Sequence, residues 1–260
     1  MRPLQYFTLP TILYRAWPLW IQLLVFLSVF NLIFWSVGVF DAFVEEPSGF
    51  HTWRQADCAG IAYLYHVDDI PFLEPEVLNQ NGDFLESGKA ATSEAPILYY
   101  AASRIYNILG FNLLYHRLLV YLVFLMGLFF YWQTIADLSK NYLLGIFGTI
   151  LLATSPFLMD YSNSFLSNIC GLSMSLSGIY FVVRWLNARS SKFLWIASGL
   201  FSLAGLFKVT ALLASLALII VFLIHGLRNR RFDFRSIVTI ASAFVLPALW
   251  IIWAKLYNQE

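Results

Sequence analysis

Long runs of apolar residues, separated by short polar segments, dominate this sequence. The first run covers residues 20–40, and as a helix of 21 residues it is long enough to cross a hydrocarbon core of about 30 Å. A backbone that crosses lipid has to satisfy its own hydrogen bonds, which favours helices. The pattern therefore predicts an all-α polytopic membrane protein. We expect about seven transmembrane helices, at residues 20–40, 118–135, 142–158, 168–186, 193–207, 209–226 and 236–253.

Two apolar segments have lengths that do not fit one crossing. Residues 96–109 would form a helix of about 21 Å, shorter than the bilayer, and residues 195–226 one of about 48 Å, too long for a single span. We interpret the first as an interfacial helix outside the membrane, and we divide the second at Lys208, which places the lysine at the outer surface. In the alternative, 96–109 crosses the membrane and the long segment is unbroken, which leaves Lys208 in mid-membrane without a partner.

The basic residues of the predicted turns indicate how the chain is oriented. Arg2 and Arg15 precede the first span, which we expect to be retained as an anchor with a cytoplasmic N-terminus, since no small-residue cleavage site follows it. Cytoplasmic turns carry an excess of Lys and Arg, so two later basic turns should lie on that side as well. These turns contain Arg184, Arg189 and Lys192 in one case and Arg228, Arg230, Arg231 and Arg235 in the other.

Composition agrees with a membrane protein that has one large polar region. Hydrophobic residues make up 60% of the chain, and 16 basic against 15 acidic residues give no concentrated basic surface for nucleic acid. Eleven of the fifteen acidic residues lie between Asp41 and Glu94. We expect a single transmembrane domain, residues 1–260, with residues 41–117 as an extracytoplasmic loop that carries short interfacial helices. The turn at 159–167 and Lys208 should face the same side as this loop.

The densest polar cluster is the segment HTWRQAD at residues 51–57. Its Asp57 offers a base, His51 a second proton carrier or metal ligand, and Arg54 an anion clamp suited to phosphate. We expect a short amphipathic helix to follow at residues 58–65. In the alternative interpretation the cluster is a solvated helix cap, in which Asp57 caps that helix and Trp53 packs on lipid headgroups.

Glu94 and Lys208 are the other two candidates for polar chemistry. Glu94 precedes the 96–109 helix, where the helix macrodipole also favours a carboxylate that has no function. Lys208 lies in an apolar stretch, where an ionisable residue is a functional candidate, although its side chain could simply extend to the interface. The two cysteines and two further histidines have no partner at metal-ligand spacing, and we assign them no role. They are Cys58, Cys170, His66 and His225.

The order of these features resembles that of the GT-C membrane glycosyltransferases. The chain is similar to glycosyltransferase family 39, a group that includes protein mannosyltransferases and the aminoarabinose transferases acting on lipid A. The resemblance rests on an anchor, an outer loop with HTWRQAD, an E-x-P segment leading into ILYYAASRIYNILGFNLLYHRLL, a TSPF turn, and GLFSLAGLFKVTALL. Members of the group are commonly about twice this length, so we expect the chain to be an N-terminal half, incomplete at its C-terminus.

The resemblance implies a GT-C-like fold and a glycosyltransferase at the bacterial plasma (inner) membrane. Such an enzyme takes a sugar from a polyprenyl-phosphate-linked donor and transfers it to a lipid, glycan or protein acceptor on the extracytoplasmic face. A divalent metal ion sometimes takes part in the reaction. The resemblance implies Asp57 as the catalytic carboxylate and Glu94 as a second one that lies near the metal. Ala95 stands where the family's E-K-P segment has a lysine.

The same resemblance implies how the substrate is bound. Lys208 matches the lysine placed near the carrier phosphate, and Arg54 would join it in stabilising the departing phosphate, with His51 as a further substrate-binding residue. In the turn after the third span the family often has an acidic residue, and here Asp160 or the neutral Asn168 could occupy that place.

Two other classes of function remain alternatives at this point. A secondary transporter or lipid flippase would use broken helices related by an internal repeat, and the sequence contains no visible repeat. A noncatalytic membrane subunit is the third reading. The large acidic loop favours the enzyme, because such a loop has no obvious role in a transporter.

Overall fold

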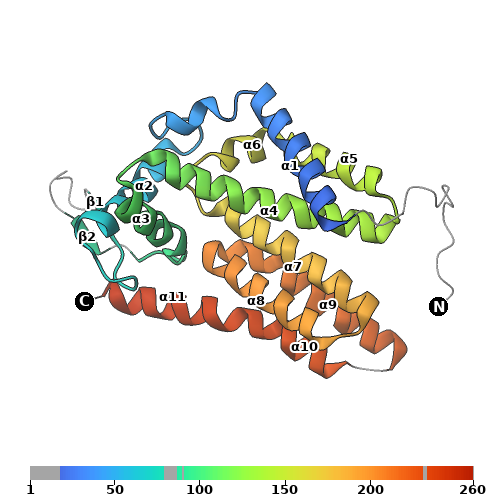
Figure 1. Cartoon of the computed structure of the whole chain (residues 1–260). Coiled ribbons are helices and arrows are strands. Elements are labelled where there is room, and N and C mark those ends of the chain that lie inside the picture. Colours follow the sequence, from blue (N-terminus) through green and yellow to red (C-terminus); the bar gives the residue numbers. More distant parts are fainter. Residues whose placement is uncertain (1–17, 79–86, 90, 231–232, 260) are drawn as a thin grey trace.

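Helices form most of the chain that the computed structural model describes, and the long ones run between the two ends of one elongated bundle (Figure 1). The described residues are 18–78, 87–89, 91–230 and 233–259. Three basic residues used for the orientation, Arg2, Arg15 and Arg231, lie outside them. The helices are α1 (Leu19–Ser36), η2 (Asp41–Val44), α2 (Thr52–Val67), α3 (Ile97–Leu109), α4 (Leu113–Ser139), α5 (Tyr142–Ala153), α6 (Pro156–Ser162), α7 (Asn168–Ala188), α8 (Ser191–Phe207), η3 (Val209–Leu212), α9 (Leu213–Asn229), α10 (Phe234–Ala241), η4 (Ser242–Phe244) and α11 (Val245–Tyr257).

Five of these helical segments are long and apolar enough to cross a membrane by length and composition. They are α1, α4, α7, the continuous stretch η3–α9, and the continuous stretch α10–α11. Helix α8 is apolar but has only 17 residues, and α5 with α6 would form a sixth crossing if the two count as one span. The fold is therefore that of an all-α polytopic membrane protein, as the sequence predicted.

One predicted span differs in shape from the expectation, and one predicted break is present. Residues 142–158 were expected to form one straight crossing, but the chain bends by 79° between α5 and α6. Pro156 stands at the start of α6, where its missing backbone N–H costs nothing and its ring prevents α5 from continuing. The predicted break at Lys208 is present: the residue has extended backbone angles, φ −155° and ψ 116°, between α8 and η3.

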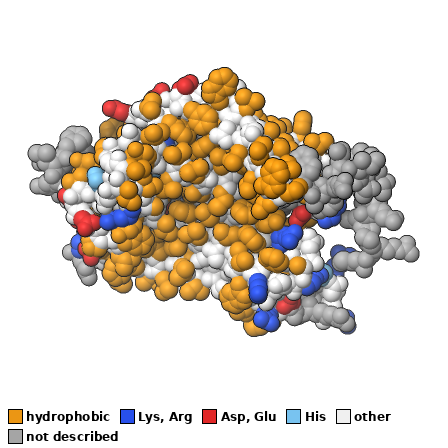
Figure 2. Space-filling model, viewed as in Figure 1, with side chains coloured by type: hydrophobic (Ala, Val, Ile, Leu, Met, Phe, Trp, Pro, Cys, Tyr) orange, Lys and Arg blue, Asp and Glu red, His pale blue; other side chains and the backbone are white. Residues whose placement is uncertain are grey.

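Polar residues at the ends of the bundle explain why the apolar helices begin and end where they do. Asn112 and Asn141 cap α4 and α5 by accepting hydrogen bonds from backbone N–H groups of the first turn. Lys140, Arg189 and Arg230 end α4, α7 and α9 in the left-handed conformation. As a result, Lys and Arg side chains gather near the two ends of the molecule, and the band between them is mostly hydrophobic (Figure 2).

Small residues allow the central helices to approach closely. A side chain at Gly127 of α4 would place its Cβ 2.5 Å from the Cα atom of Ser173 on α7, and one at Gly178 of α7 would meet the ring of Phe201 on α8 at 2.7 Å. Close backbone approach is what holds helices together in lipid, where the hydrophobic effect between them is weak. Helices α4, α7 and α8 therefore form the packed centre of the bundle (Figure 1).

The segment that follows α1 folds over one end of this bundle. Helix α2 packs against α3, and a two-stranded antiparallel hairpin, β1 (Glu76–Leu78) and β2 (Ser87–Lys89), pairs Val77 with Gly88. The buried Arg117 of α4 donates hydrogen bonds to the backbone carbonyls of Ala42, Glu45 and Glu46, which fixes the start of the segment. The predicted interfacial helix 96–109 is α3, one of the elements at this end.

The motif HTWRQAD lies differently from the expectation. The amphipathic helix was expected to begin after it, at residue 58, but α2 already begins at Thr52. Asp57 is therefore in the second turn of the helix and does not cap it, so the alternative reading of Asp57 as a cap residue is wrong. His51 takes the N-cap position, in the left-handed conformation with φ 57°.

The close approach of α4 and α7 predicts that Gly127→Ala destabilises the fold. The added methyl group has to push α7 away, and overpacking of this kind costs about 1–3 kcal/mol. The midpoint of thermal unfolding in detergent measures the effect. Gly199→Ala on α8 is the control, because a Cβ there has nothing within 4 Å; equal loss in both variants would contradict the packing argument.

The course of the helices predicts that the α2 end and the α7–α8 turn lie on opposite membrane faces. Ser48 and Asn187 are exposed at these two ends, and the native Cys58 and Cys170 are buried. We expect Ser48→Cys to react with a membrane-impermeant maleimide from one side of sealed vesicles and Asn187→Cys only from the other. Labelling of both from the same side would contradict the arrangement.

Candidate functional site

Glu94 is the centre of a polar cluster at the α2 end of the bundle. Its segment lies between β2 and α3 and is held against the transmembrane helices, because the Ala95 N–H donates to the carbonyl of Leu206 at 2.8 Å. The indole of Trp250 on α11 donates to the carbonyl of Thr92 at 3.0 Å. These bonds fix the backbone on both sides of Glu94, so its carboxylate has a defined position.

Three segments far apart in the sequence direct proton donors at the Glu94 carboxylate. Lys208 Nζ lies 2.5 Å from Oε1, and the guanidinium of Arg54 pairs with the same oxygen. The hydroxyl of Ser167 donates to the other oxygen, Oε2, at 2.6 Å. The side chain of Glu94 is 4% exposed, whereas those of Arg54 and Lys208 are 43% and 27% exposed. The carboxylate is thus buried beneath two cations that still reach the surface.

The break between α8 and η3 presents Lys208 to this cluster. The Lys208 N–H still closes the last turn of α8 by donating to Ala204, and its carbonyl opens η3 by accepting from the Ala211 N–H, both at 2.8 Å. Gly171 of α7 leaves room for the lysine stem, since a Cβ there would lie 3.1 Å from that of Lys208. The lysine predicted to be a surface or functional residue is therefore a fixed partner of Glu94.

Electrostatics favours the ionised forms of Glu94 and Arg54. Burial raises the pKa of Glu94, but hydrogen bonds from Lys208, Ser167 and Arg54 outweigh burial and hold its pKa below the ordinary value. For Arg54, burial lowers the pKa, while the hydrogen bond and charge of Glu94 raise it, and the net direction is upward. Two cations around one carboxylate leave the cluster with a net positive charge.

A neutral hydrogen-bonded group lies behind the carboxylate. The hydroxyl of Tyr99 on α3 is 3.0 Å from the thiol of Cys58 on α2, and it also interacts with Ser167. Burial raises the pKa of Cys58 to about 11 and that of Tyr99 well above its ordinary value, so both keep their protons at neutral pH. Sequence reasoning missed this group; the one available signal was that Cys58 follows Arg54 by four residues and so shares its helix face.

Asp57 lies beside the cluster but is not part of the ion pairs. It follows Arg54 by three residues on α2, which puts the two side chains on adjacent positions of one helix face. The side chain is exposed, and burial of part of its surroundings raises its pKa above the ordinary value. Among the described residues no hydrogen bond to its carboxylate is found, so the carboxylate is accessible to a ligand.

His51 and Asp160 form a neighbouring group at the N-terminal end of α2. Asp160 of α6 accepts a hydrogen bond from the Phe50 backbone N–H, and the His51 ring lies 6.3 Å from that of Tyr161, centroid to centroid. A Cβ at Gly49 would lie 2.9 Å from Asp160 Oδ1, and Gly49 has φ 74°, so glycine is required here. The structure thus brings His51 and Asp160 together, one helical turn before Arg54.

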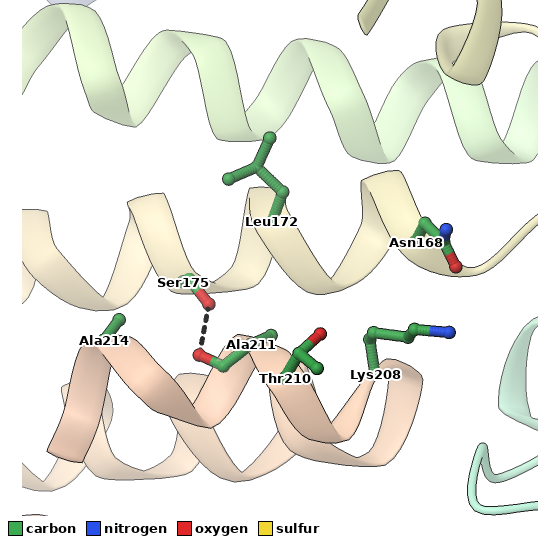
Figure 3. A pocket seen from close by; sticks show the side chains of 7 residues that line it. All are labelled: Asn168, Leu172, Ser175, Lys208, Thr210, Ala211 and Ala214. Atoms are coloured by element: carbon green, nitrogen blue, oxygen red, sulfur yellow. Dashed lines mark hydrogen bonds between the residues drawn. The ribbon is translucent and has the colours of Figure 1, made fainter. Parts of the chain in front are cut away.

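A groove leads away from Lys208 between α7 and the η3–α9 stretch. It has a volume of about 360 Å³. Figure 3 shows Lys208 and Asn168 at one end of the groove and Ser175 and Ala214 at the other. The hydroxyl of Ser175 donates to the carbonyl of Ala211 at 3.1 Å across its floor. The remaining lining residues are Leu172, Thr210 and Ala211, so the groove is polar at the Lys208 end and mostly apolar beyond it.

The residues around Glu94 do not fit a divalent metal ion as they stand. Metal ions of this kind need several carboxylate, carbonyl or imidazole ligands, whereas both oxygens of Glu94 accept hydrogen bonds from cations or a hydroxyl. In the described part of the chain, no three His, Cys, Asp or Glu side chains lie close enough together to hold a metal. The metal-ligand role of Glu94 stays a prediction.

The fold and the site together define a polytopic membrane protein with a charged cluster at one end of its helices and a groove between α7 and the η3–α9 stretch beside it. The model of the family described as dolichyl-phosphate-mannose-protein mannosyltransferase matches residues 93–253, and the chain belongs to this family of GT-C membrane glycosyltransferases. The match includes Glu94, Ser167 and Lys208 but begins after Arg54 and Asp57. No curated protein and no solved structure matches the chain.

The buried carboxylate predicts a specific dependence of stability on pH. Because the native pKa of Glu94 lies below its ordinary value of about 4.3, its contribution is complete at neutral pH and is lost as the pH falls through the native pKa. We expect Glu94→Gln to lower the free energy of unfolding by about 1–3 kcal/mol at pH 7, since both cations lose their partner but remain partly exposed.

Thermal unfolding of both proteins between pH 7 and pH 3 measures this effect. The difference between wild type and Glu94→Gln should shrink toward the acid end. Glu46→Gln, at an exposed residue of the same outer segment, is the control and should change little at any pH. A pH-independent difference between wild type and Glu94→Gln would show that the ion pairs are not its cause.

Proposed function

We propose that the chain transfers a sugar from a polyprenyl-phosphate-linked donor to a hydroxyl group of a lipid, glycan or protein acceptor on the extracytoplasmic face. The observation that carries this proposal is the position of Lys208. Its ammonium group lies at the polar end of a groove between membrane helices and shares the Glu94 carboxylate with Arg54. A ligand with a charged phosphate and a long apolar tail fits such a pair of features.

The donor phosphate would bind between Arg54 and Lys208. Both cations are held in place by Glu94 and are partly exposed, so they would bind an anion without first rearranging. A guanidinium and an ammonium together supply several charge-assisted hydrogen bonds to phosphate oxygens. The first isoprene units would follow the groove along α7 and α9, past Leu172 and Ala214, toward the membrane interior.

Asp57 would act as the general base. The acceptor oxygen attacks the anomeric carbon of the sugar, its proton passes to Asp57, and the bond between that carbon and the phosphate oxygen breaks. The polyprenyl phosphate leaves with the bonding electrons, and the charge that develops on it faces Arg54 and Lys208. Asp57 is exposed, its carboxylate accepts no hydrogen bond from the described residues, and its pKa is raised. These three properties suit a general base.

Glu94 would then have a positioning role at this step, because its carboxylate is committed to Arg54, Lys208 and Ser167. His51 and Asp160 would bind the acceptor or the sugar from the N-terminal end of α2. A sugar hydroxyl needs both donors and acceptors of hydrogen bonds, and an imidazole beside a carboxylate supplies both. Membership in a glycosyltransferase family favours this reaction over the transporter or flippase alternative.

Two substitutions separate the base from the phosphate site. We expect Asp57→Asn to lower turnover at least about 100-fold while donor binding persists, because the proton acceptor is lost. We expect Lys208→Gln to weaken donor binding by about 10–100-fold, the loss of one charge-assisted hydrogen bond. The measurement is release of radiolabelled sugar from a polyprenyl-phosphate carrier by the full chain in nanodiscs, with donor binding measured in parallel.

Asp68→Asn and Lys192→Gln are the matched controls, since both residues are exposed and lie away from the cluster. Size-exclusion profiles show whether each variant is folded. Full turnover in Asp57→Asn would remove the proposed base. Unchanged donor binding in a folded Lys208→Gln variant would remove the proposed phosphate site, and binding of donor without any turnover in the wild type would favour a noncatalytic subunit.

A further inference from the structure

Two adjoining cavities lie at the opposite end of the bundle from Glu94, where α7 and α9 end and α10 begins. The larger one, about 400 Å³, has apolar walls that include Val182, Leu218 and Phe222. The smaller one, about 170 Å³, has polar walls that include Ser191, Arg235 and Thr239. Four residues line both cavities, namely Trp185, Arg189, Asp233 and Ser236. Because these residues separate or border both, the two form a double cavity with an apolar and a polar part.

Two guanidinium groups give the polar part its charge. Arg189 and Arg235 both line it, and neither forms an ion pair with a carboxylate of the described residues. Arg189 is fixed by its left-handed backbone at the end of α7, and its guanidinium lies 5.7 Å from the centre of the Trp185 ring. Two arginines that face one polar cavity are suited to bind the oxygens of a phosphate group.

The one carboxylate in the cavity is already engaged within its own helix. Asp233 caps α10, because its two oxygens accept hydrogen bonds from the N–H of Ser236 at 3.2 Å and from the Ser236 hydroxyl at 2.6 Å. It therefore compensates only part of the charge of the two arginines. With two cations against one anion among these lining residues, the polar part favours a ligand that carries a negative charge.

The apolar part limits what that ligand can be. Its apolar walls come from α7 and α9, two helices apolar enough to cross a membrane, and its residues Leu186 and Val221 are exposed. An inorganic phosphate would fill only the polar part and would leave the larger, apolar part empty. An acyl chain can enter from the bilayer along α9 while its headgroup stays at the interface, where Trp185 has the amphipathic ring typical of that depth.

We propose that this double cavity binds one phospholipid of the leaflet at the Arg189 end, with the phosphodiester between Arg189 and Arg235 and an acyl chain along α9. The lipid would join α7, α9 and α10, which meet at this cavity, and so stabilise the end of the bundle that continues through α10 into α11. This site is independent of the sugar-transfer proposal, because it lies at the other end of α7.

The test is binding of dioleoyl phosphatidylglycerol to the purified full chain in detergent, by thermal shift and native mass spectrometry. We expect saturating lipid to raise the unfolding midpoint by about 5 °C or more, and inorganic phosphate to raise it far less. In the double variant R189Q/R235Q, lipid affinity should fall at least tenfold. In the control R228Q/K192Q, which removes two exposed charges of the same end outside the cavity, it should stay within twofold.

A second variant tests the apolar part without changing any charge. Val221→Trp fills the space meant for the acyl chain and should lower lipid affinity at least tenfold, while the unfolding midpoint without lipid shows whether the variant is folded. An equal shift with inorganic phosphate, unchanged affinity in R189Q/R235Q, equal losses in the two double variants, or full affinity in a folded Val221→Trp protein would each overturn the proposal.

Discussion

The charge of an almost fully buried carboxylate has to be compensated, and the arrangement of the α2 end depends on how the charge of Glu94 is compensated. Removing a carboxylate from water is costly unless cations and hydrogen-bond donors replace the lost hydration. Arg54 from α2, Ser167 before α7 and Lys208 after α8 provide that replacement. Each donor belongs to a different segment, so one side chain fixes the position of the outer helices relative to the membrane helices.

The membrane explains where the irregular backbone lies. Lipid tolerates an interrupted helix only where protein or a cavity satisfies the freed groups, and the break at Lys208 meets that condition. Its own N–H and C=O groups bond to Ala204 and Ala211, and its side chain leaves the apolar region for Glu94. The same break opens the groove beside α7, so the interruption supplies both the cation and the space beneath it.

The two proposals place amphipathic ligands at the two ends of α7. In both cases the structure offers arginine or lysine groups near an end of the bundle and an adjoining cavity with apolar walls. The difference lies in what stands beside the cations. At the Glu94 end an accessible carboxylate, Asp57, adjoins them and could accept a proton, whereas at the Arg189 end the carboxylate of Asp233 is engaged in a helix cap. The first arrangement suits a reaction and the second suits retention of a lipid.

The sequence by itself determined the class of the protein, most of its membrane helices and the break at Lys208. These follow from the length and polarity of continuous segments, because the thickness of the bilayer sets the length that each spanning helix needs. It also singled out Glu94, Arg54 and Lys208, because charged residues stand out in an apolar chain. Only the tertiary structure decided that these three share one contact, that Ser167, Tyr99 and Cys58 support it, that α5 and α6 bend apart, and that α2 begins before Asp57 rather than after it. Contacts between residues up to 114 positions apart depend on how helices pack, and periodicity along one segment carries no information about that.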